Sequence, residues 1–240
     1  MEKSNEKVAL VTGGSKGIGY GVAEALLRQG YKVAITSRSL SHAQEAADKL
    51  SLSDKDKVLA LEADVRSLEE QQNAVQEILD QWGRLDVLIA NAGLGHFAPI
   101  SELSASQWEE TIDTNLTGVF YSVKASLDAI KKQKGYIITI SSLAGTNFFA
   151  GGTAYNASKF GLTGFTQALM LDVRSDDVKV TTIMPGSVAT HFNGNEPSSK
   201  DAWKIQIEDM GKLVIDLLTM HPRTLPSKVE VRPSRPPSSK

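Results

Sequence analysis

The stretch "VALVTGGSKGIG", residues 8–19, decides the fold, because an apolar run here meets four glycines within eight residues. Glycine is unfavourable inside a strand or a helix, so such a cluster indicates a tight turn between the two. The residues that follow, "YGVAEALLRQG", have the spacing of an amphipathic helix. Gly13, Gly17 and Gly19 depart from the common G-x-G-x-x-G spacing, so the segment alone is compatible with a phosphate-binding loop or with a turn that serves only packing.

Short apolar runs alternate with longer helical patterns along the rest of the chain. Strands are expected within residues 7–13, 32–38, 57–64, 85–93, 135–142 and 178–186, and helices near 17–29, 42–51, 67–82, 104–132, 155–175 and 200–220. Apolar strands separated by helices form parallel sheets that are covered on both faces. We therefore predict a single α/β domain: a Rossmann-type, doubly wound parallel sheet of six to seven strands.

The end of the chain has a different composition. Five of the eight prolines lie at positions 222, 226, 233, 236 and 237. We assign residues 1–222 to this single domain and 223–240 to a proline-rich C-terminal segment. Within that segment, "KVEVR" (228–232) could add an edge strand before a flexible tail.

Composition and charge exclude several classes of function. The net charge of −2 offers no basic surface for nucleic acid or for an acidic membrane, and no apolar run reaches the length of a membrane helix. The chain has no cysteine, and a polar N-terminus leads directly into the first strand, so we expect a cytoplasmic protein. We predict no metal site, because none of the four histidines has a partner at the spacing of metal ligands: His42, His96, His191 and His221.

The end of the second strand indicates which dinucleotide the chain would bind. NAD sites place an acid about 20 residues after the glycines, whereas NADP sites offer arginine to the 2′-phosphate. This chain has Ser37, Arg38 and Ser39 there and no acid, and Lys16 lies within the glycine loop. Two cations without a carboxylate favour NADP(H) as the cofactor.

Tyr155 and Lys159, in "YNASK", lie four residues apart and therefore on one face of a helix. A nearby ammonium favours the phenolate and so lowers the pKa of a tyrosine towards the range of a proton donor or acceptor. Ser142, at the end of the fifth strand, brings a hydroxyl to the same edge of the sheet. Together these three residues predict acid–base chemistry on an oxygen atom.

With these motifs in order, the chain resembles the short-chain dehydrogenase/reductase family in its compact single-domain form. The resemblance covers residues 7–192 and rests on "TGGSKGIG", "NAG" (91–93), "TNLTG" (114–118), "SS" (141–142), "YNASK" (155–159) and "PGSVAT" (185–190). It points to the NADP-preferring reductases of the family, those acting on 3-oxoacyl-carrier proteins or on sepiapterin.

The resemblance implies roles for particular residues. Tyr155 is expected to be the general acid, Ser142 to bind the carbonyl oxygen, Lys159 to assist Tyr155 and bind the ribose, and Asn115 to hold a water that connects Lys159 to solvent. The implied cofactor-binding set is Gly13, Ser15, Lys16, Gly17, Ile18, Gly19, Ser37, Arg38, Ser39, Asp64, Val65, Asn91, Ala92, Gly93, Tyr155, Lys159, Pro185, Gly186, Val188 and Thr190. It also implies a homodimer, or a tetramer, built on apolar stripes within residues 108–132 and 160–175.

Two features depart from the family pattern. Ala90 stands where an asparagine is frequent, and the chain ends in "VEVRPSRPPSSK" in place of a glycine-rich segment. That ending puts tetramer formation and the substrate class in question.

Aromatic residues in the loops beside this site suggest an apolar or flat substrate. His96, Phe148 and Phe192, with Ser142 and Tyr155, form the expected substrate-binding set. The leading hypothesis is an NADPH-dependent carbonyl reductase acting on a 3-oxoacyl thioester, a pterin side-chain ketone or another small ketone. The alternatives are an NAD-dependent alcohol dehydrogenase and a non-catalytic NADP(H)-binding regulator.

Overall fold

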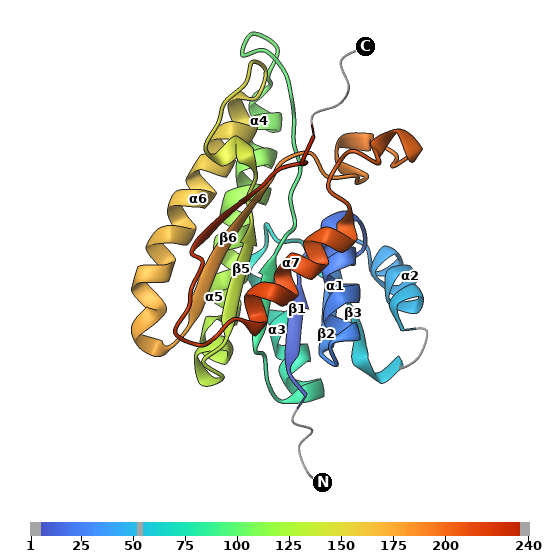
Figure 1. Ribbon diagram of the computed structural model, residues 1–240, viewed down its shortest axis with the longest axis vertical. Coiled ribbons are helices and arrows are strands. Elements are labelled where there is room, and N and C mark those ends of the chain that lie inside the picture. Colours follow the sequence, from blue (N-terminus) through green and yellow to red (C-terminus); the bar gives the residue numbers. More distant parts are fainter. Residues whose placement is uncertain (1–5, 52–54, 236–240) are drawn as a thin grey trace.

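A seven-stranded parallel sheet forms the centre of the protein, in a computed structural model that describes residues 6–51 and 55–235 (Figure 1). The strand order is β3-β2-β1-β4-β5-β6-β7. The strands are β1 (Val8–Val11), β2 (Lys32–Ser37), β3 (Val58–Glu62), β4 (Val87–Ala90), β5 (Tyr136–Ile140), β6 (Lys179–Pro185) and β7 (Lys228–Val231). The order reverses direction at β1, so the crevice between β1 and β4 is where a doubly wound sheet binds ligands.

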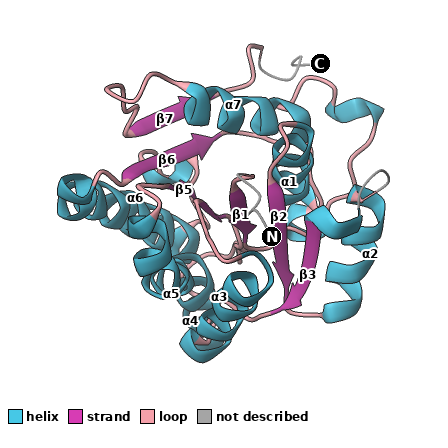
Figure 2. Cartoon of the chain, turned by 90° about the horizontal axis from the view of Figure 1, so that it is seen from below, coloured by secondary structure: helices cyan, strands magenta, loops and turns pink. Residues whose placement is uncertain are grey.

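Helices cover both faces of the sheet (Figure 2). One face carries α1 (Gly17–Arg28), α2 (Leu40–Leu50) and α7 (Ile207–Thr219), and the other carries α3 (Leu68–Trp82), α5 (Gly118–Lys132) and α6 (Thr153–Val173), with α4 (Ala105–Ile112) beside α6. The predicted single-domain, doubly wound α/β fold is thereby confirmed. No helix in the described ranges is long and apolar enough to cross a membrane.

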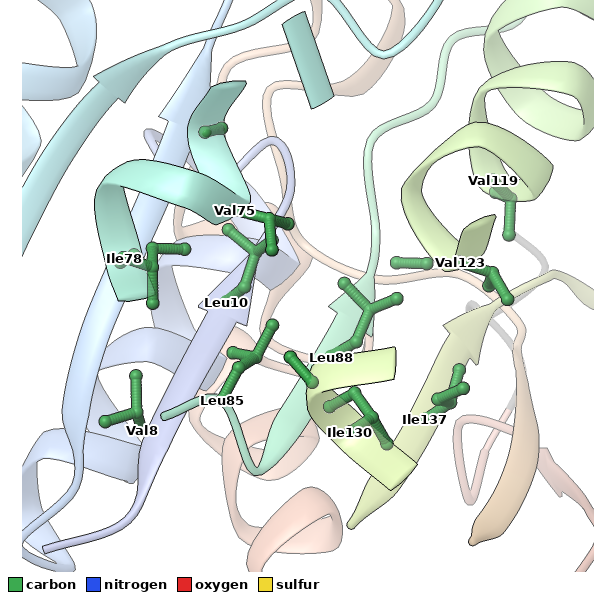
Figure 3. Close-up of a cluster of buried hydrophobic side chains, with 14 of the residues drawn as sticks. Val8, Leu10, Val75, Ile78, Leu85, Leu88, Val119, Val123, Ile130 and Ile137 are labelled. Atoms are coloured by element: carbon green, nitrogen blue, oxygen red, sulfur yellow. The ribbon is translucent and has the colours of Figure 1, made fainter. Parts of the chain in front are cut away.

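Alternation along the strands divides the core into two layers. Val8 and Leu10 of β1 face α3 and α5, whereas Ala9 and Val11 face α1 and α7. Figure 3 shows the first layer, in which Val75 of α3 lies against Leu10. Both faces of each central strand are therefore buried, which explains their nearly unbroken apolar sequence.

Two glycines allow helices α1 and α7 to approach each other closely. A Cβ atom added at Gly21 would lie 2.5 Å from the carbonyl oxygen of Ile207, and one added at Gly211 would lie 2.7 Å from that of Gly21. Side chains at these positions would hold the helices apart. This contact anchors the helix that follows the loop at residues 186–206.

The structure divides the helix expected over residues 104–132. Helix α4 ends at Ile112, a π-helical turn spans Asp113–Thr117, and α5 begins at Gly118. The expected helix near 200–220 begins later, at Ile207, after a short 3₁₀ turn at Ser199–Asp201. The "KVEVR" segment supplies β7, which pairs in parallel with β6 at the sheet edge, and the last five residues of the tail expected to be flexible lie outside the described ranges.

Candidate active site

A cleft of about 1990 Å³ runs along the carboxyl ends of the strands. It brings together residues from the glycine loop, the ends of β2 to β6 and helix α6. Most of the predicted site residues line it: Gly13, Ser15, Lys16, Gly17, Ile18, Ser37, Arg38, Ser39, Asp64, Val65, Asn91, Ala92, Gly93, His96, Ser142, Tyr155, Lys159, Pro185, Gly186, Val188, Thr190 and Phe192. Gly19, Asn115 and Phe148 do not line it.

The glycine loop is held in place by Asn91 at the end of β4. The Asn91 side-chain amide donates to the carbonyls of Thr12 (2.9 Å) and Gly13 (3.1 Å), and its backbone N–H donates to the Thr12 hydroxyl (3.0 Å). Gly13 has a φ of +63°, and a Cβ atom there would lie 2.9 Å from the Ala92 backbone. Gly19 is buried behind the loop, where its missing side chain makes room for the Asn91 amide.

The start of helix α1 fits the diphosphate of a dinucleotide. Its N-cap residue, Lys16, makes no side-chain capping bond, and the first turn contains no acidic residue. Backbone N–H groups at an uncapped N-terminus need an acceptor, and the helix dipole favours an anion there. Gly17, with a φ of +58°, keeps the loop open between this helix end and Thr190.

Arg38 lies at the end of the cleft that would receive the adenosine. Its guanidinium is 3.8 Å from a carboxylate oxygen of Glu110 on α4, and 63% of its side chain is exposed. Nearby, Arg66 binds Asp64 through two side-chain hydrogen bonds of 3.0 Å and a third, shorter one. Burial raises the pKa of Asp64, but the hydrogen bonds from Arg66 outweigh it and hold that pKa below its ordinary value.

Ser142, Tyr155 and Lys159 meet at the end of β5. A side-chain hydrogen bond connects Ser142 with Tyr155. The Lys159 ammonium lies 5.7 Å from the centre of the Tyr155 ring and donates to the Ile140 carbonyl at 3.0 Å. The backbone N–H of Ala144 donates to the Ser142 hydroxyl oxygen at 3.1 Å, which fixes the orientation of this side chain.

Burial shifts the pKa values of both ionisable residues. It raises the pKa of Tyr155, and the hydrogen bond from Ser142 offsets only part of the rise. It lowers the pKa of Lys159 to about 8. The lowered Tyr155 pKa expected from the sequence is therefore not found in the protein alone, because burial raises this pKa and the Ser142 hydrogen bond offsets only part of the rise.

Asn115 is fully buried in the π-helical turn. Its side chain binds both backbone groups of Leu94, accepting from the N–H at 2.9 Å and donating to the carbonyl at 2.8 Å, and also donates to the Ser158 hydroxyl at 3.0 Å. These bonds connect the loop after β4 to helix α6. Asn115 thus positions the site without lining the cleft.

Two phenylalanine rings contact the Tyr155 ring, and a third packs against one of them. Phe97 packs edge-on against the Tyr155 ring at 5.3 Å, Phe192 lies at 5.8 Å, and Phe149 contacts Phe97 at 5.7 Å. The structure does not bring Phe148 into the cleft: its side chain is 84% exposed and stacks on Phe160 outside it. Neighbouring residues of a loop point in different directions, and the sequence does not indicate which of Phe148 and Phe149 turns inward.

His96 lines the cleft and is held by a carboxylate. Its Nε2 atom lies 2.8 Å from Glu110, the residue that also attracts Arg38. Sequence reasoning assigned no role to Glu110, because nothing in a helical pattern marks one exposed acid among several. Across the described ranges, no group of three histidine or acidic side chains could hold a metal ion.

The C-terminal segment completes the cleft. Arg232, Pro233 and Arg235 line it, beside the 185–190 segment. The Gly186 N–H donates to the Val231 carbonyl at 2.8 Å, which ties the chain after β7 to the end of β6. The sequence did not indicate that these residues line the site, because a proline-rich composition is typical of a flexible tail.

Comparisons with known proteins agree with this geometry. The family model described as short chain dehydrogenase matches residues 7–201. An uncharacterized oxidoreductase of Staphylococcus saprophyticus is 33% identical over 97% of this chain and its own full length. A 3-oxoacyl-[acyl-carrier-protein] reductase of Synechocystis is 36% identical over 81% of this chain and 79% of its own length.

Among solved structures, an alcohol dehydrogenase from the archaeon Thermococcus sibiricus complexed with 5-hydroxy-NADP superimposes with a TM-score of 0.90 at 30% identity. The superposition covers 97% of this chain and 99% of that one. The chain is a member of the short-chain dehydrogenase/reductase family.

Proposed function

We propose that the protein is an NADP(H)-dependent carbonyl reductase that interconverts a ketone and a secondary alcohol. The observation that carries this proposal is the meeting of Ser142, Tyr155 and Lys159 in one cleft with an uncapped helix N-terminus. A non-catalytic nucleotide-binding protein has no need of this acid–base group.

The chain's own residues would bind the carbonyl and supply the proton, while a bound nicotinamide supplies the hydride. The Tyr155 hydroxyl, kept protonated by burial, donates its proton to the carbonyl oxygen. The Ser142 hydroxyl binds the same oxygen and holds it next to Tyr155. As charge develops on Tyr155, the Lys159 ammonium stabilises it from its buried position.

The preference for NADP(H) is supported by Arg38 and Lys16. Both line the cleft, and the ion pair of Arg38 with Glu110 is long, at 3.8 Å, and leaves 63% of the Arg38 side chain exposed. A guanidinium binds a phosphate with two parallel hydrogen bonds, which an exposed side chain can form. The Thermococcus relative was solved with 5-hydroxy-NADP, which agrees with this assignment.

We propose a small ketone or a 3-oxoacyl thioester as the substrate. The name of the Synechocystis relative favours the thioester. A pterin side-chain ketone is a further candidate. The name of the Thermococcus relative, an alcohol dehydrogenase, agrees with a secondary alcohol as the reduced member of the substrate pair. We also propose a homodimer through α5 and α6.

The proposal is tested by following NADPH oxidation with a panel of carbonyl compounds. Tyr155→Phe keeps the ring and its contacts with Phe97 and Phe192 but removes the proton donor. We expect it to lower kcat by at least about 100-fold while leaving NADPH binding nearly unchanged. Unchanged turnover by this variant would place the proton donor elsewhere, and a panel without any turnover would favour the regulator.

The cofactor preference has a separate test. Fluorescence titration should show tighter binding of NADPH than of NADH, and Arg38→Glu should reverse that order by repelling the 2′-phosphate. Lys49→Glu, on α2 in the same part of the cleft, is the matched control for a general change of charge. Equal affinities for the two cofactors in the unmodified protein would rule out the NADP(H) assignment.

A further inference from the structure

The chain after β7 turns back beside the reacting centre. A Cβ atom added at Gly186 would lie 3.3 Å from the Pro233 ring and 3.1 Å from the Leu143 side chain. Pro233 therefore lies close to the residue that follows Ser142. Arg232 and Arg235 flank this proline, and both line the cleft.

Charges are distributed unevenly along the cleft. Its three lining carboxylates, on Glu45, Asp64 and Glu110, belong to the end that contains Arg38. Asp64 forms an ion pair with Arg66, and Glu110 forms ion pairs with His96 and Arg38. At the other end the lining residues include Lys204, Arg232 and Arg235 and no acid, and of these Lys204 is paired with Asp201 at 2.7 Å.

The two arginines differ in how strongly they are neutralised. Arg232 forms a hydrogen bond of 3.1 Å with Glu230 and remains 57% exposed. Glu230 is shared, since it also accepts a hydrogen bond from Thr146 at 3.5 Å. Arg235 forms no ion pair with any residue in the described ranges, so its charge is available to a ligand.

We propose that Arg232 and Arg235 bind an oxyanion of the substrate, so that the preferred carbonyl compound carries a carboxylate or a phosphate. This inference rests on the proposed reductase function and narrows its substrate class. Guanidinium groups pair with both oxyanions through charge-assisted hydrogen bonds, whereas a neutral ketone gains nothing from them. The aromatic rings around Tyr155 would contact the part of the substrate between the carbonyl and the anion.

The test compares carbonyl compounds that differ in charge. Oxo acids of increasing chain length are paired with their methyl esters, and dihydroxyacetone phosphate is paired with dihydroxyacetone, so that the two arms separate carboxylate from phosphate. We expect kcat/KM to be about tenfold higher for the charged member of at least one pair. Added salt should reduce this preference, because exposed charges are screened.

Variants connect the preference to the two arginines. Arg232→Gln and Arg235→Gln should each raise KM for the charged substrate several-fold and leave the ester or the unphosphorylated ketone unchanged. Arg174→Gln, at an exposed arginine outside the cleft, is the matched control and should change neither. Glu230→Gln should lower KM for the charged substrate, because it releases Arg232; a purely structural role for the segment does not predict this gain.

Several outcomes would overturn the inference. It fails if neutral ketones are reduced as well as their charged partners, or if Arg235→Gln alters both members of a pair equally. Turnover of neutral ketones without a preference would leave the reductase function in place and remove only the anion site. A complete lack of turnover across the panel would instead overturn the reductase function, and the anion site with it.

Discussion

The surroundings of Lys159 indicate that this residue has a chemical role and not only a structural one. Lys159 is 4% exposed, and its ammonium donates to the Ile140 carbonyl without an ion pair to any carboxylate of the described residues. Burial without a counter-charge disfavours the charged form and lowers the pKa to about 8. A lysine that served only to stabilise the fold would be replaced advantageously by an apolar residue.

The lowered pKa of Lys159 predicts how stability depends on pH. Between pH 8 and the unfolded value of 10.5, the unfolded chain binds a proton on this side chain and the folded chain does not. The free energy of unfolding therefore rises with pH in this window and is independent of Lys159 below it. From pH 8 to pH 9.5 the expected rise is up to roughly 2 kcal/mol at 1.36 kcal/mol per pH unit.

Urea unfolding at several pH values checks this expectation, with Lys159→Met as the control. The difference in unfolding free energy between the two proteins isolates this side chain from tyrosines that titrate above pH 10. A difference that stays flat between pH 8 and pH 9.5 would mean that the folded protein keeps the ammonium charged.

At the scale of elements, the helical stretch formed by α4, the π-helical turn and α5 is important for the assembly of the site. Its sequence has one continuous apolar stripe, and the π-helical turn within it has no separate signature in composition. The turn is stabilised by the bonds of Asn115 to Leu94 and Ser158, which are distant in sequence. Only the resemblance to a family indicated that Asn115 matters, and not the helical pattern.

The strand exits were predictable for a different reason. Buried parallel strands are apolar throughout, so the first polar or small residue after each marks the edge where ligands bind. Thr12, Asn91 and Ser141 follow this rule, and Ser141 directly precedes Ser142. Phe149 does not, because its position depends on how its loop folds over that edge. Arg232 directly follows β7, but β7 is an edge strand that is only partly buried, so its sequence does not mark the exit in the same way.

The α1–α7 contact makes a prediction about helix packing. Gly21→Ala would place a Cβ atom 2.5 Å from the Ile207 carbonyl oxygen and force the helices apart. We expect the free energy of unfolding to fall by about 1–3 kcal/mol, as for other overpacked sites. The measurement is urea unfolding followed by circular dichroism.

Gly164→Ala is the matched control for that substitution. Gly164 lies on the exposed side of α6, where an added Cβ would meet no other part of the chain within 4 Å, so alanine there should raise the stability of the monomer by about 0.5–1 kcal/mol through its helix propensity. If both substitutions were stabilising, the close approach of α1 and α7 would not be a property of the folded protein.

On the scale of the whole molecule, helices α5 and α6 carry several exposed apolar side chains. Phe120 of α5 and Phe160 and Leu171 of α6 are each more than 40% exposed, and Phe120 packs edge-on against Phe165 at 6.3 Å. These helices cover the sheet face opposite α1 and α7 (Figure 2). Contiguous exposed rings on a helical face indicate a surface that another protein covers.

The proposed homodimer would bury these side chains against their own copies across a two-fold axis, since an isologous interface uses the same surface on both subunits. Replacing Phe120 and Phe160 together by aspartate would place charges in that interface and should shift the protein to the 25.9 kDa monomer. Sedimentation velocity at micromolar concentration would measure the change.

Ile100→Asp is the control for this double substitution. The Ile100 side chain is 73% exposed in the loop before α4, so aspartate there should leave the assembly intact. A protein that is monomeric before substitution, or a doubly substituted one that still dimerises, would contradict the proposed surface.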